Sequence, residues 1–357
     1  MTSILTASTI RSALISSLAV LLAFATASLL LAAAGQNPFI SFAGMASTAF
    51  GSAFAIGTTL TKSVPRLLPA LGIALALRAG LWNIGAEGQI YVGAAAAAGV
   101  ALFGPTIPLA MGLALFAAML AGAFWAAIPG ALRAYRGVNE VITTLMMVYI
   151  GIHLTNYLIE GPWLVPNRTW PSTALVPASY KLPIIWPGTL VNAGIIVAVL
   201  GIFALHLVVR RTTFGLWIRA VGGNERASLI IGLPTRLLIV GALAASGAFA
   251  GLAGGIEVLG IRGRLLEGFS PGYGFEAIAI ALLGRLHPLG ITAATLLFGA
   301  LDAGAAGLQV ASVGISSAIA PVIEALAVAY LLAGLGLAEI ISQRQKAHSA
   351  LQAAAKG

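Results

Sequence analysis

The chain has 357 residues, of which 59% are hydrophobic and 8% are charged, with a formal net charge of +9. Soluble domains carry about 25% charged residues, so this composition excludes a water-soluble globule and requires lipid around most of the surface. Without cysteine there is no disulfide or thiolate site, the four His are scattered, and the dispersed bases argue against nucleic acid. We therefore expect no metal, no cofactor and no nucleic-acid partner.

The apolar runs are continuous rather than alternating, which indicates helices and not a β-barrel. A helix needs about 20 apolar residues to cross the hydrocarbon core. The sequence thus predicts an all-α membrane protein of about ten transmembrane helices, at residues 12–34, 63–79, 89–106, 108–130, 138–159, 189–209, 236–258, 273–286, 288–309 and 315–337. The first run is too long for a cleavable signal peptide, so we interpret it as a retained span. The stretch 43–61 is left open between a re-entrant helix, an interfacial helix and a further span.

The distribution of bases predicts the orientation. With both termini cytoplasmic, six bases fall outside the membrane, namely Lys62, Arg66, Arg168, Lys181, Arg262 and Arg264, and the other thirteen of the nineteen fall inside. This bias obeys the positive-inside rule. We expect one transmembrane domain over residues 1–357, a cytoplasmic loop at 210–236 and a flexible cytoplasmic tail at 343–357.

Residues 81–89 place Asn83, Glu87 and Gln89 between two apolar spans, next to two helix-breaking glycines. Polar side chains at membrane depth are usually satisfied in a cavity or between helices. The alternative is a tight cytoplasmic turn with Glu87 solvated near Arg78, and the chemistry favours neither.

Asn139 and Glu140 open the fifth predicted span. An Asn N-cap followed by an acid in the first turn suits the helix dipole, so capping is favoured over substrate contact. Further along the same span, Asn156, Tyr149 and Tyr157 either line a path or tie helices together.

The cytoplasmic loop contains a short amphipathic segment, a Gly-Gly break, a second short helix capped by Asn224 and a Gly-x-Pro stop. A connector between two spans needs only a few residues. The loop therefore indicates a docking site for a soluble partner, and the alternative is an interfacial helix anchored in lipid by Leu216 and Trp217.

The isolated acids Glu276, Asp302 and Glu324 fall in or beside spans, where an ionisable residue is a functional hypothesis by default. The chain lacks the P-loop pattern and the common hydrolase and zinc motifs. We expect neither an enzyme nor an ATPase, and no catalytic residue.

Four motifs occur in order along the chain: GLWNIGAEGQ at 80–89, GVNEVI at 137–142, VGGNERA at 221–227 and GFEAIAIALLG at 274–284. Together they resemble permease subunits of bacterial ABC importers of the branched-chain amino acid, ribose and simple-sugar group. The nucleoside-type members are the most similar, and the likeness extends from about residue 60 onward.

The resemblance implies a type II importer fold in the bacterial cytoplasmic (inner) membrane, with no metal or cofactor. The implied partners are a cytoplasmic ATP-binding subunit, a second permease that is a copy or a paralogue, and a periplasmic or lipid-anchored substrate-binding protein. It assigns ATPase coupling to Gly222, Gly223, Asn224 and Ala227, while Glu225 and Arg226 differ from many members.

These observations predict the permease subunit of an ATP-binding cassette importer for a nucleoside or simple sugar. The expected substrate pathway contains Asn83, Glu87, Gln89, Asn139, Glu140 and Asn156. An apparent lack of buried cations argues against an anionic substrate. The alternatives are a proton-coupled secondary transporter that uses Glu87, Glu276 or Glu324, and a membrane scaffold without transport.

Overall fold

The structure is a computed structural model that describes residues 2–107, 109–166, 170–311, 321–330 and 332–334. Within these ranges the chain is helical, and its only β-type pairings are two isolated bridges, Ser172 to Leu266 and Ile184 to Asn192. The predicted all-α class is confirmed. The chain divides into two compact units, one of residues 1–51 with 301–357 and one of residues 52–300. A single domain over 1–357 and the tail at 343–357, which lies outside the described ranges, stay predictions.

The first unit contains α1 (Thr2–Ala33), α2 (Pro38–Phe50), the end of α12 (Pro288–Ala311) and the described helical residues between 321 and 334. Asn37 caps α2, because its side chain accepts a hydrogen bond from the Phe39 amide. The Thr26 and Tyr330 hydroxyls lie 2.7 Å apart and connect α1 with the helical residues 321–330. The stretch 43–61 is therefore two pieces, the end of α2 and the start of α3.

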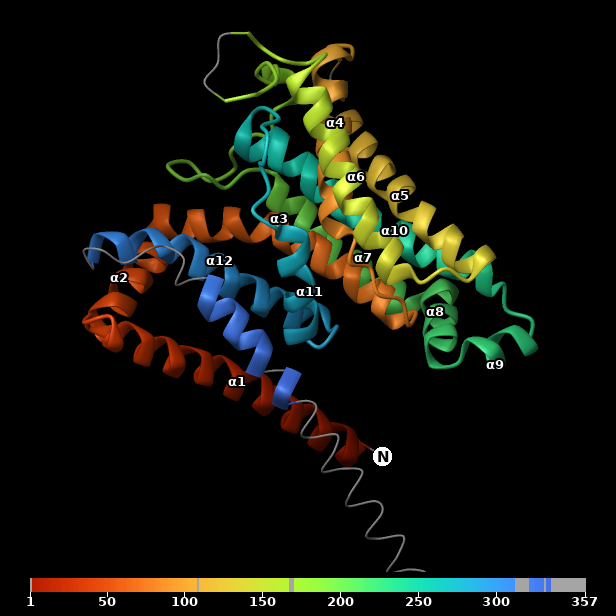
Figure 1. The fold of residues 1–357 in the computed structure, drawn as a ribbon, viewed down its shortest axis with the longest axis horizontal. Helices are drawn as coiled ribbons and strands as arrows, with labels where there is room; N and C mark the ends of the chain where they lie inside the picture. Colours follow the sequence, from red (N-terminus) through yellow and green to blue (C-terminus); the bar gives the residue numbers. More distant parts are fainter. Residues whose placement is uncertain (1, 108, 167–169, 312–320, 331, 335–357) are drawn as a thin grey trace, which may run out of the picture. The chain divides into compact units, whose positions relative to one another are not determined.

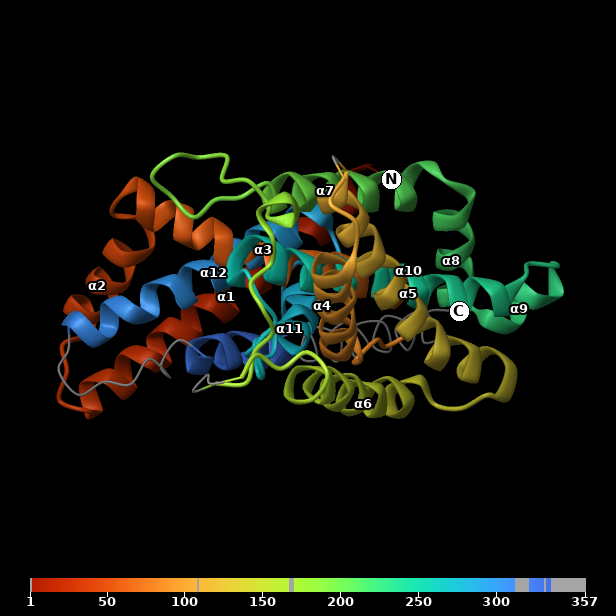
Figure 2. The same ribbon diagram turned by 90° about the horizontal axis from the view of Figure 1, so that it is seen from above.

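The second unit holds the longest run of packed helices (Figures 1 and 2). Its long helices are α3 (Ala53–Arg78), α4 (Ala86–Phe103), α5 (Ala110–Arg136), α6 (Glu140–Glu160), α7 (Gly194–Arg211) and α10 (Thr235–Ile256). Its short ones are the 3₁₀ turn η1 (Ala178–Tyr180), α8 (Thr213–Gly223), α9 (Glu225–Ile230), the π-helical turn η2 (Glu257–Arg262) that continues α10, and α11 (Tyr273–Leu283). The helices α8 and α9 project from one end of this unit (Figure 1).

Small residues bring the central helices into backbone contact. A Cβ on Gly122 of α5 would lie 2.7 Å from the Gly251 Cα of α10, and a Cβ on Gly93 of α4 would overlap the same glycine. Helices in lipid pack through such small residues, because the hydrophobic effect does not drive them together there. The small residues of α10 therefore let its backbone pack directly against α4 and α5.

The helix α3 begins ten residues earlier than the predicted span 63–79, at Ala53. Pro65 and Pro69 lie inside it, so neither proline ends the helix. Lys62 and Arg66 are therefore residues of one continuous helix, and the side of the membrane on which they lie stays a prediction.

Seven described helices are long and apolar enough to cross a membrane, and four apolar segments are shorter. Among the shorter ones, α11 has 11 residues and a length of about 16 Å, roughly half of the hydrocarbon core. The number of ten spans and the cytoplasmic termini stay predictions.

Candidate functional site

Asn83 and Gln89 form a reciprocal pair of amide hydrogen bonds in the turn between α3 and α4. The Asn83 Nδ2 donates to Gln89 Oε1 and the Gln89 Nε2 donates to Asn83 Oδ1, both over 3.0 Å. The Asn83 amide also donates to the Ser246 hydroxyl of α10, and its oxygen accepts from the Gly85 amide. Asn83 and Gln89 are 2% and 1% exposed. The tight turn of the alternative interpretation is present, but it is buried and its polar groups are satisfied.

Glu87 is buried and joins the first turns of two helices. It lies in the first turn of α4, and its Oε2 accepts a hydrogen bond of 2.6 Å from the Gly274 amide in the first turn of α11. The positive end of each helix dipole favours a carboxylate at this place. A Cβ on Gly274 would overlap the Glu87 backbone, so the motifs at 80–89 and 274–284 meet here. The solvated Glu87 of the alternative interpretation is wrong.

The helix α6 is fixed against the start of α4. The Thr144 hydroxyl accepts from the Ile84 amide over 3.3 Å, and the backbones of Gly88 and Gly151 approach so closely that neither position has room for a side chain. The motif at 80–89 therefore holds α6 as well as α11.

At the start of α6, Asn139 caps the helix through a 2.8 Å hydrogen bond from the Val141 amide. Glu140 lies 3.2 Å from Arg133 at the end of α5, and the same guanidinium lies 2.9 Å from Glu225 at the start of α9. Arg133 thus links the first turn of α6 to the segment expected to couple with an ATPase. Sequence reasoning missed Arg133, because a base at the cytoplasmic end of a span carries no signal of its partners.

The coupling segment, α8 with α9, is a folded element. Asn224 ends α8 and caps α9, with its Oδ1 accepting from the Ala227 amide over 3.0 Å. The apolar side of α8 is buried through Ile218 and Val221. Gly222 packs on the backbone at the end of α3, whereas Gly223 has open space around it. A substituted Gly222 would therefore separate α8 from α3.

The free side of the coupling segment carries an apolar tip, which we define as Leu229, Ile230 and Ile231. These residues are exposed, Ile230 to 85%. Glu225 and Arg226 are exposed beside them. Contiguous exposed apolar residues with a polar rim are typical of a protein interaction site.

One face of α6 is exposed and carries polar side chains within a membrane span. Tyr149, His153 and Tyr157 recur along this face at the helical spacing of four residues. On the neighbouring turn, the Asn156 Oδ1 is buried and has no hydrogen-bond partner among the described residues. Polar groups in a span usually face a cavity or another helix and not lipid.

A buried ion pair lies in the middle of α3. The Arg66 Nε is 2.5 Å from Glu276 Oε2 of α11, and the guanidinium lies over the Tyr273 ring. The expectation that the chain has no buried cation is wrong, because the Arg66 side chain is 3% exposed and pairs with Glu276 where α11 packs on α3. Because Glu276 neutralises Arg66, this pair has no net positive charge that would attract an anionic substrate. Glu257 forms a second pair with Arg262, at 2.8 Å.

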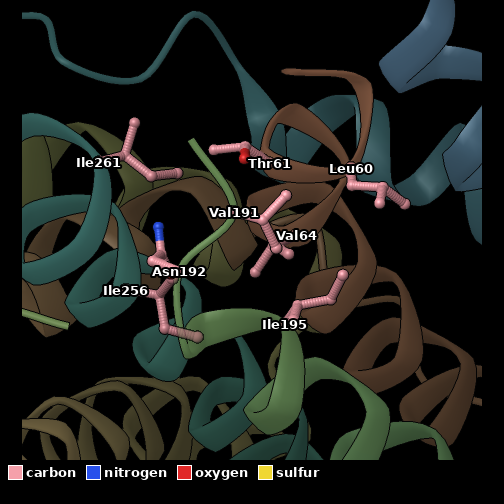
Figure 3. Close-up of a pocket in the computed structure, with 8 residues that line it drawn as sticks. All are labelled: Leu60, Thr61, Val64, Val191, Asn192, Ile195, Ile256 and Ile261. Carbon is pink, nitrogen blue, oxygen red and sulfur yellow. The ribbon is translucent and has the colours of Figure 1, made fainter. Parts of the chain in front are cut away.

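A small pocket lies between α3, the segment before α7, and the end of α10 (Figure 3). Its lining is apolar except for Thr61 and Asn192, and Asn192 is already bonded to the Gly260 carbonyl and the Gly194 amide. The side chains leave no room there even for a water-sized sphere, whereas ligand pockets enclose roughly 300–1,000 Å³. A nucleoside does not fit in it.

The six predicted pathway residues do not form one site. Asn83, Glu87 and Gln89 are buried together, Asn139 and Glu140 start α6, and Asn156 lies 16 residues further along this helix, which is about 24 Å. Their role in substrate contact stays a prediction.

The family described as "Branched-chain amino acid transport system / permease component" matches residues 55–337. The glucose ABC transporter permease protein TsgB13 of Haloferax volcanii is 36% identical, over 88% of this chain and 86% of the relative. The guanosine ABC transporter permease protein NupP of Bacillus subtilis is 34% identical, over 92% and 95%.

The nucleoside ABC transporter permease protein NupB of Lactococcus lactis is 33% identical, over 97% of each chain. Both bacteria have a second guanosine or nucleoside permease protein that is also similar, at 27% and 26% identity. No solved structure matches the chain.

Proposed function

The chain belongs to the family of permease components of branched-chain amino acid transport systems, and from this premise we propose that it imports a nucleoside. It is a multi-pass permease subunit of an ATP-binding cassette importer in the cytoplasmic membrane, and its energy comes from a separate ATP-binding subunit. Family membership supports this function over the proton-coupled alternative. The subunit contributes to transport and not to catalysis.

The substrate class rests on one observation. Two relatives that match more than 90% of this chain are named as guanosine and nucleoside permeases. A simple sugar is the second candidate, because the relative with 36% identity is named as a glucose permease. Both classes are neutral and polar, which suits tyrosine and asparagine side chains.

The exposed face of α6 lines the pathway in this proposal. This face carries Tyr149, His153 and Tyr157, and the buried Asn156 Oδ1, which has no hydrogen-bond partner among the described residues, lies beside it on the same helix. A second permease subunit, a paralogue, faces it and completes the path between the two chains. The presence of two similar permease proteins in each of two bacteria supports a paralogous partner.

The coupling segment is the docking site for the ATP-binding subunit. The apolar tip supplies the buried contacts and the polar residues around it supply the rim, with Gly222, Gly223, Asn224, Glu225, Arg226 and Ala227 shaping the segment. A periplasmic or lipid-anchored protein delivers the substrate from outside.

An Ile230→Asp variant should abolish coupled uptake, since it places a charge at the centre of an apolar contact. Its detergent melting temperature should stay unchanged, because Ile230 has few internal contacts.

Uptake of labelled guanosine and labelled glucose, in vesicles that contain the permeases, the ATP-binding subunit and the binding protein, tests the proposal. We expect ATP-dependent guanosine uptake that stops when the ATP-binding subunit is left out. Uptake that survives without this subunit contradicts the transport mechanism. Glucose uptake without guanosine uptake contradicts only the substrate class.

The absence of cysteine makes thiol labelling a clean test of the pathway. In the assembled transporter, Tyr157→Cys should react with a membrane-impermeant maleimide, and substrate should slow the reaction. Leu200→Cys, on an exposed apolar position of α7, is the control and should stay unlabelled. Equal labelling of both variants contradicts a pathway along α6.

A further inference from the structure

Six bases gather at one end of the second unit, and we call them the basic cluster. They come from the last turn of α3, from α7, from α8, and from the loop between α11 and α12, and they are Arg78, His206, Arg210, Arg219, Arg285 and His287. Arg210 and Arg219 act electrostatically on Arg78, and Arg210, Arg78 and His206 act on His287. Four segments that are distant in sequence therefore concentrate positive charge in one place.

Contacts of the backbone fix this arrangement. The Arg78 Nη2 donates a 2.7 Å hydrogen bond to the Leu286 carbonyl, which ties α3 to the loop. Arg285 and Leu286 have φ angles of 55° and 58°, a conformation that non-glycine residues rarely adopt. Gly222 at the end of α8 packs on the backbone of residues 78–80. The basic cluster is thus held by the fold and is not a chance meeting of long side chains.

Among the described residues, no carboxylate balances the positive charge of the cluster. Arg66, Arg133 and Arg262 each pair with a carboxylate, but within the described ranges no base of the cluster forms a salt bridge. The Arg78 Nε is buried without a hydrogen-bond partner there. Burial, followed by repulsion from Arg210, Arg78 and His206, lowers the pKa of His287 below its usual value. Uncompensated cations at a protein surface attract an anion.

Exposed apolar residues adjoin the cluster in the sequence and on the same helices. Leu207 precedes Arg210 on α7, Leu216 and Trp217 precede Arg219 on α8, and Leu289 follows His287. Tryptophan is enriched at the membrane–water interface, where its ring is amphipathic. Trp217 and the apolar residues beside the bases therefore favour a position near the lipid headgroups.

We propose that the basic cluster binds the phosphate of an anionic phospholipid headgroup, with the acyl chains against the exposed apolar residues of α7 and α8. Basic pockets between membrane helices on the cytoplasmic side bind such headgroups. Arginine suits this role because its planar guanidinium binds phosphate through two parallel hydrogen bonds. A free phosphate has the same chemistry, but it makes no use of the apolar border.

The test uses the full chain, assembled with its partner subunits and placed in nanodiscs of phosphatidylcholine with a minor share of phosphatidylglycerol. Native mass spectrometry measures how much of each lipid stays bound. We expect the wild type to retain phosphatidylglycerol selectively, and Arg210→Gln with Arg219→Gln to lower its retention by about fivefold per base. Arg210→Lys with Arg219→Lys keeps the charge and should retain most of the selectivity. Arg136→Gln, which removes an exposed base of α5 outside the cluster, is the matched control.

The outcomes separate the sources of the anion. Selective retention that persists in excess inorganic phosphate supports the lipid site, and displacement by phosphate alone overturns it. Equal retention by the wild type and the Gln double variant also overturns it. A Gln double variant that keeps the lipid but loses the ATP-binding subunit assigns the cluster to protein docking instead. If the Gln double variant does not fold, the lipid retention of the charge-retaining Lys double variant is compared with that of the wild type.

Discussion

The turn before α4 and the segment before α9 each contain an Asn and a Glu at a helix start, yet the two regions use them in opposite ways. Asn83 and Glu87 are buried and bonded to groups of α10 and α11. Asn224 and Glu225 are exposed; Asn224 caps α9 locally, and Glu225 pairs with Arg133 of α5.

The turn before α4 therefore belongs to the structural scaffold, whereas the start of α9 belongs to an exposed interface. A buried polar group destabilises the fold when its hydrogen bonds are removed, by roughly 1–3 kcal/mol, whereas an exposed ion pair contributes about 0–1 kcal/mol. Changes around Glu87 should therefore act on folding. Changes around Glu225 should act on the transfer of force from the ATP-binding subunit.

The largest effect is expected for Gly274→Ala. Its Cβ would lie 2.7 Å from the Ala86 carbonyl carbon and would overlap the Glu87 backbone, so α11 must move away from α4 and the Glu87 cap is lost. We expect a loss of about 3 kcal/mol in the free energy of unfolding. The melting temperature of the detergent-solubilised chain, followed by size-exclusion chromatography, measures it.

Gly112→Ala is the matched control, because Gly112 is also helical and no atom lies within 4 Å of an added Cβ. This variant should be neutral or more stable, by up to about 1 kcal/mol. Equal melting temperatures for both variants would contradict the role of Gly274 as a point of close approach.

The sequence predicted the helices and caps well, because these depend on local patterns. Each of the ten predicted spans contains described helical residues, and the caps at Asn139 and Asn224 follow from an Asn before an acid. The start of α3 was wrong by ten residues. The segment before residue 63 is rich in Thr and resembles a loop, but Thr59, Thr61 and Ser63 are buried in the helix.

Long-range polar partners were not predictable from one sequence. Nothing local to Arg66 indicates Glu276, 210 positions away, and nothing local to Arg133 indicates that it contacts both Glu140 and Glu225. Only the packing of α3 on α11, and of α5 beside the coupling segment, creates these pairs. The motifs indicated which segments carry the important polar residues, whereas the fold determines which of these side chains contact one another.

A smaller effect is expected when the Arg133 bridge is cut. Arg133→Gln should change stability by less than about 1 kcal/mol but should lower the amount of substrate imported per ATP hydrolysed by a few-fold. The reason is that Glu225 no longer connects α9 with α5 and α6. If the residues act through one another, the double variant with Glu225→Gln should be no worse than Arg133→Gln alone.

Arg136→Gln, one turn further along α5, is the control for this bridge and should keep the wild-type ratio. Additive losses in the double variant would mean that Arg133 and Glu225 act separately. An unchanged ratio in Arg133→Gln would show that the bridge does not take part in coupling.

The smallest effect concerns His287 and the pH. Burial and the neighbouring cations, Arg210 and His206 of α7 and Arg78 of α3, lower its pKa, so the unfolded chain takes up this proton before the folded chain does. Stability should therefore fall as the pH drops from about 7.5 to about 5.5, by only a few tenths of a kcal/mol (about 0.3), because water screens the exposed imidazole. Thermal melts of the wild type and His287→Gln in phosphatidylcholine nanodiscs measure this difference, with His153→Gln of α6 as the control. Phosphatidylglycerol should remove the difference between the pH responses of the two proteins, since an anion beside Arg78 and Arg210 favours protonated His287. An equal pH response of the wild type and His287→Gln in phosphatidylcholine would contradict an uncompensated positive charge around His287.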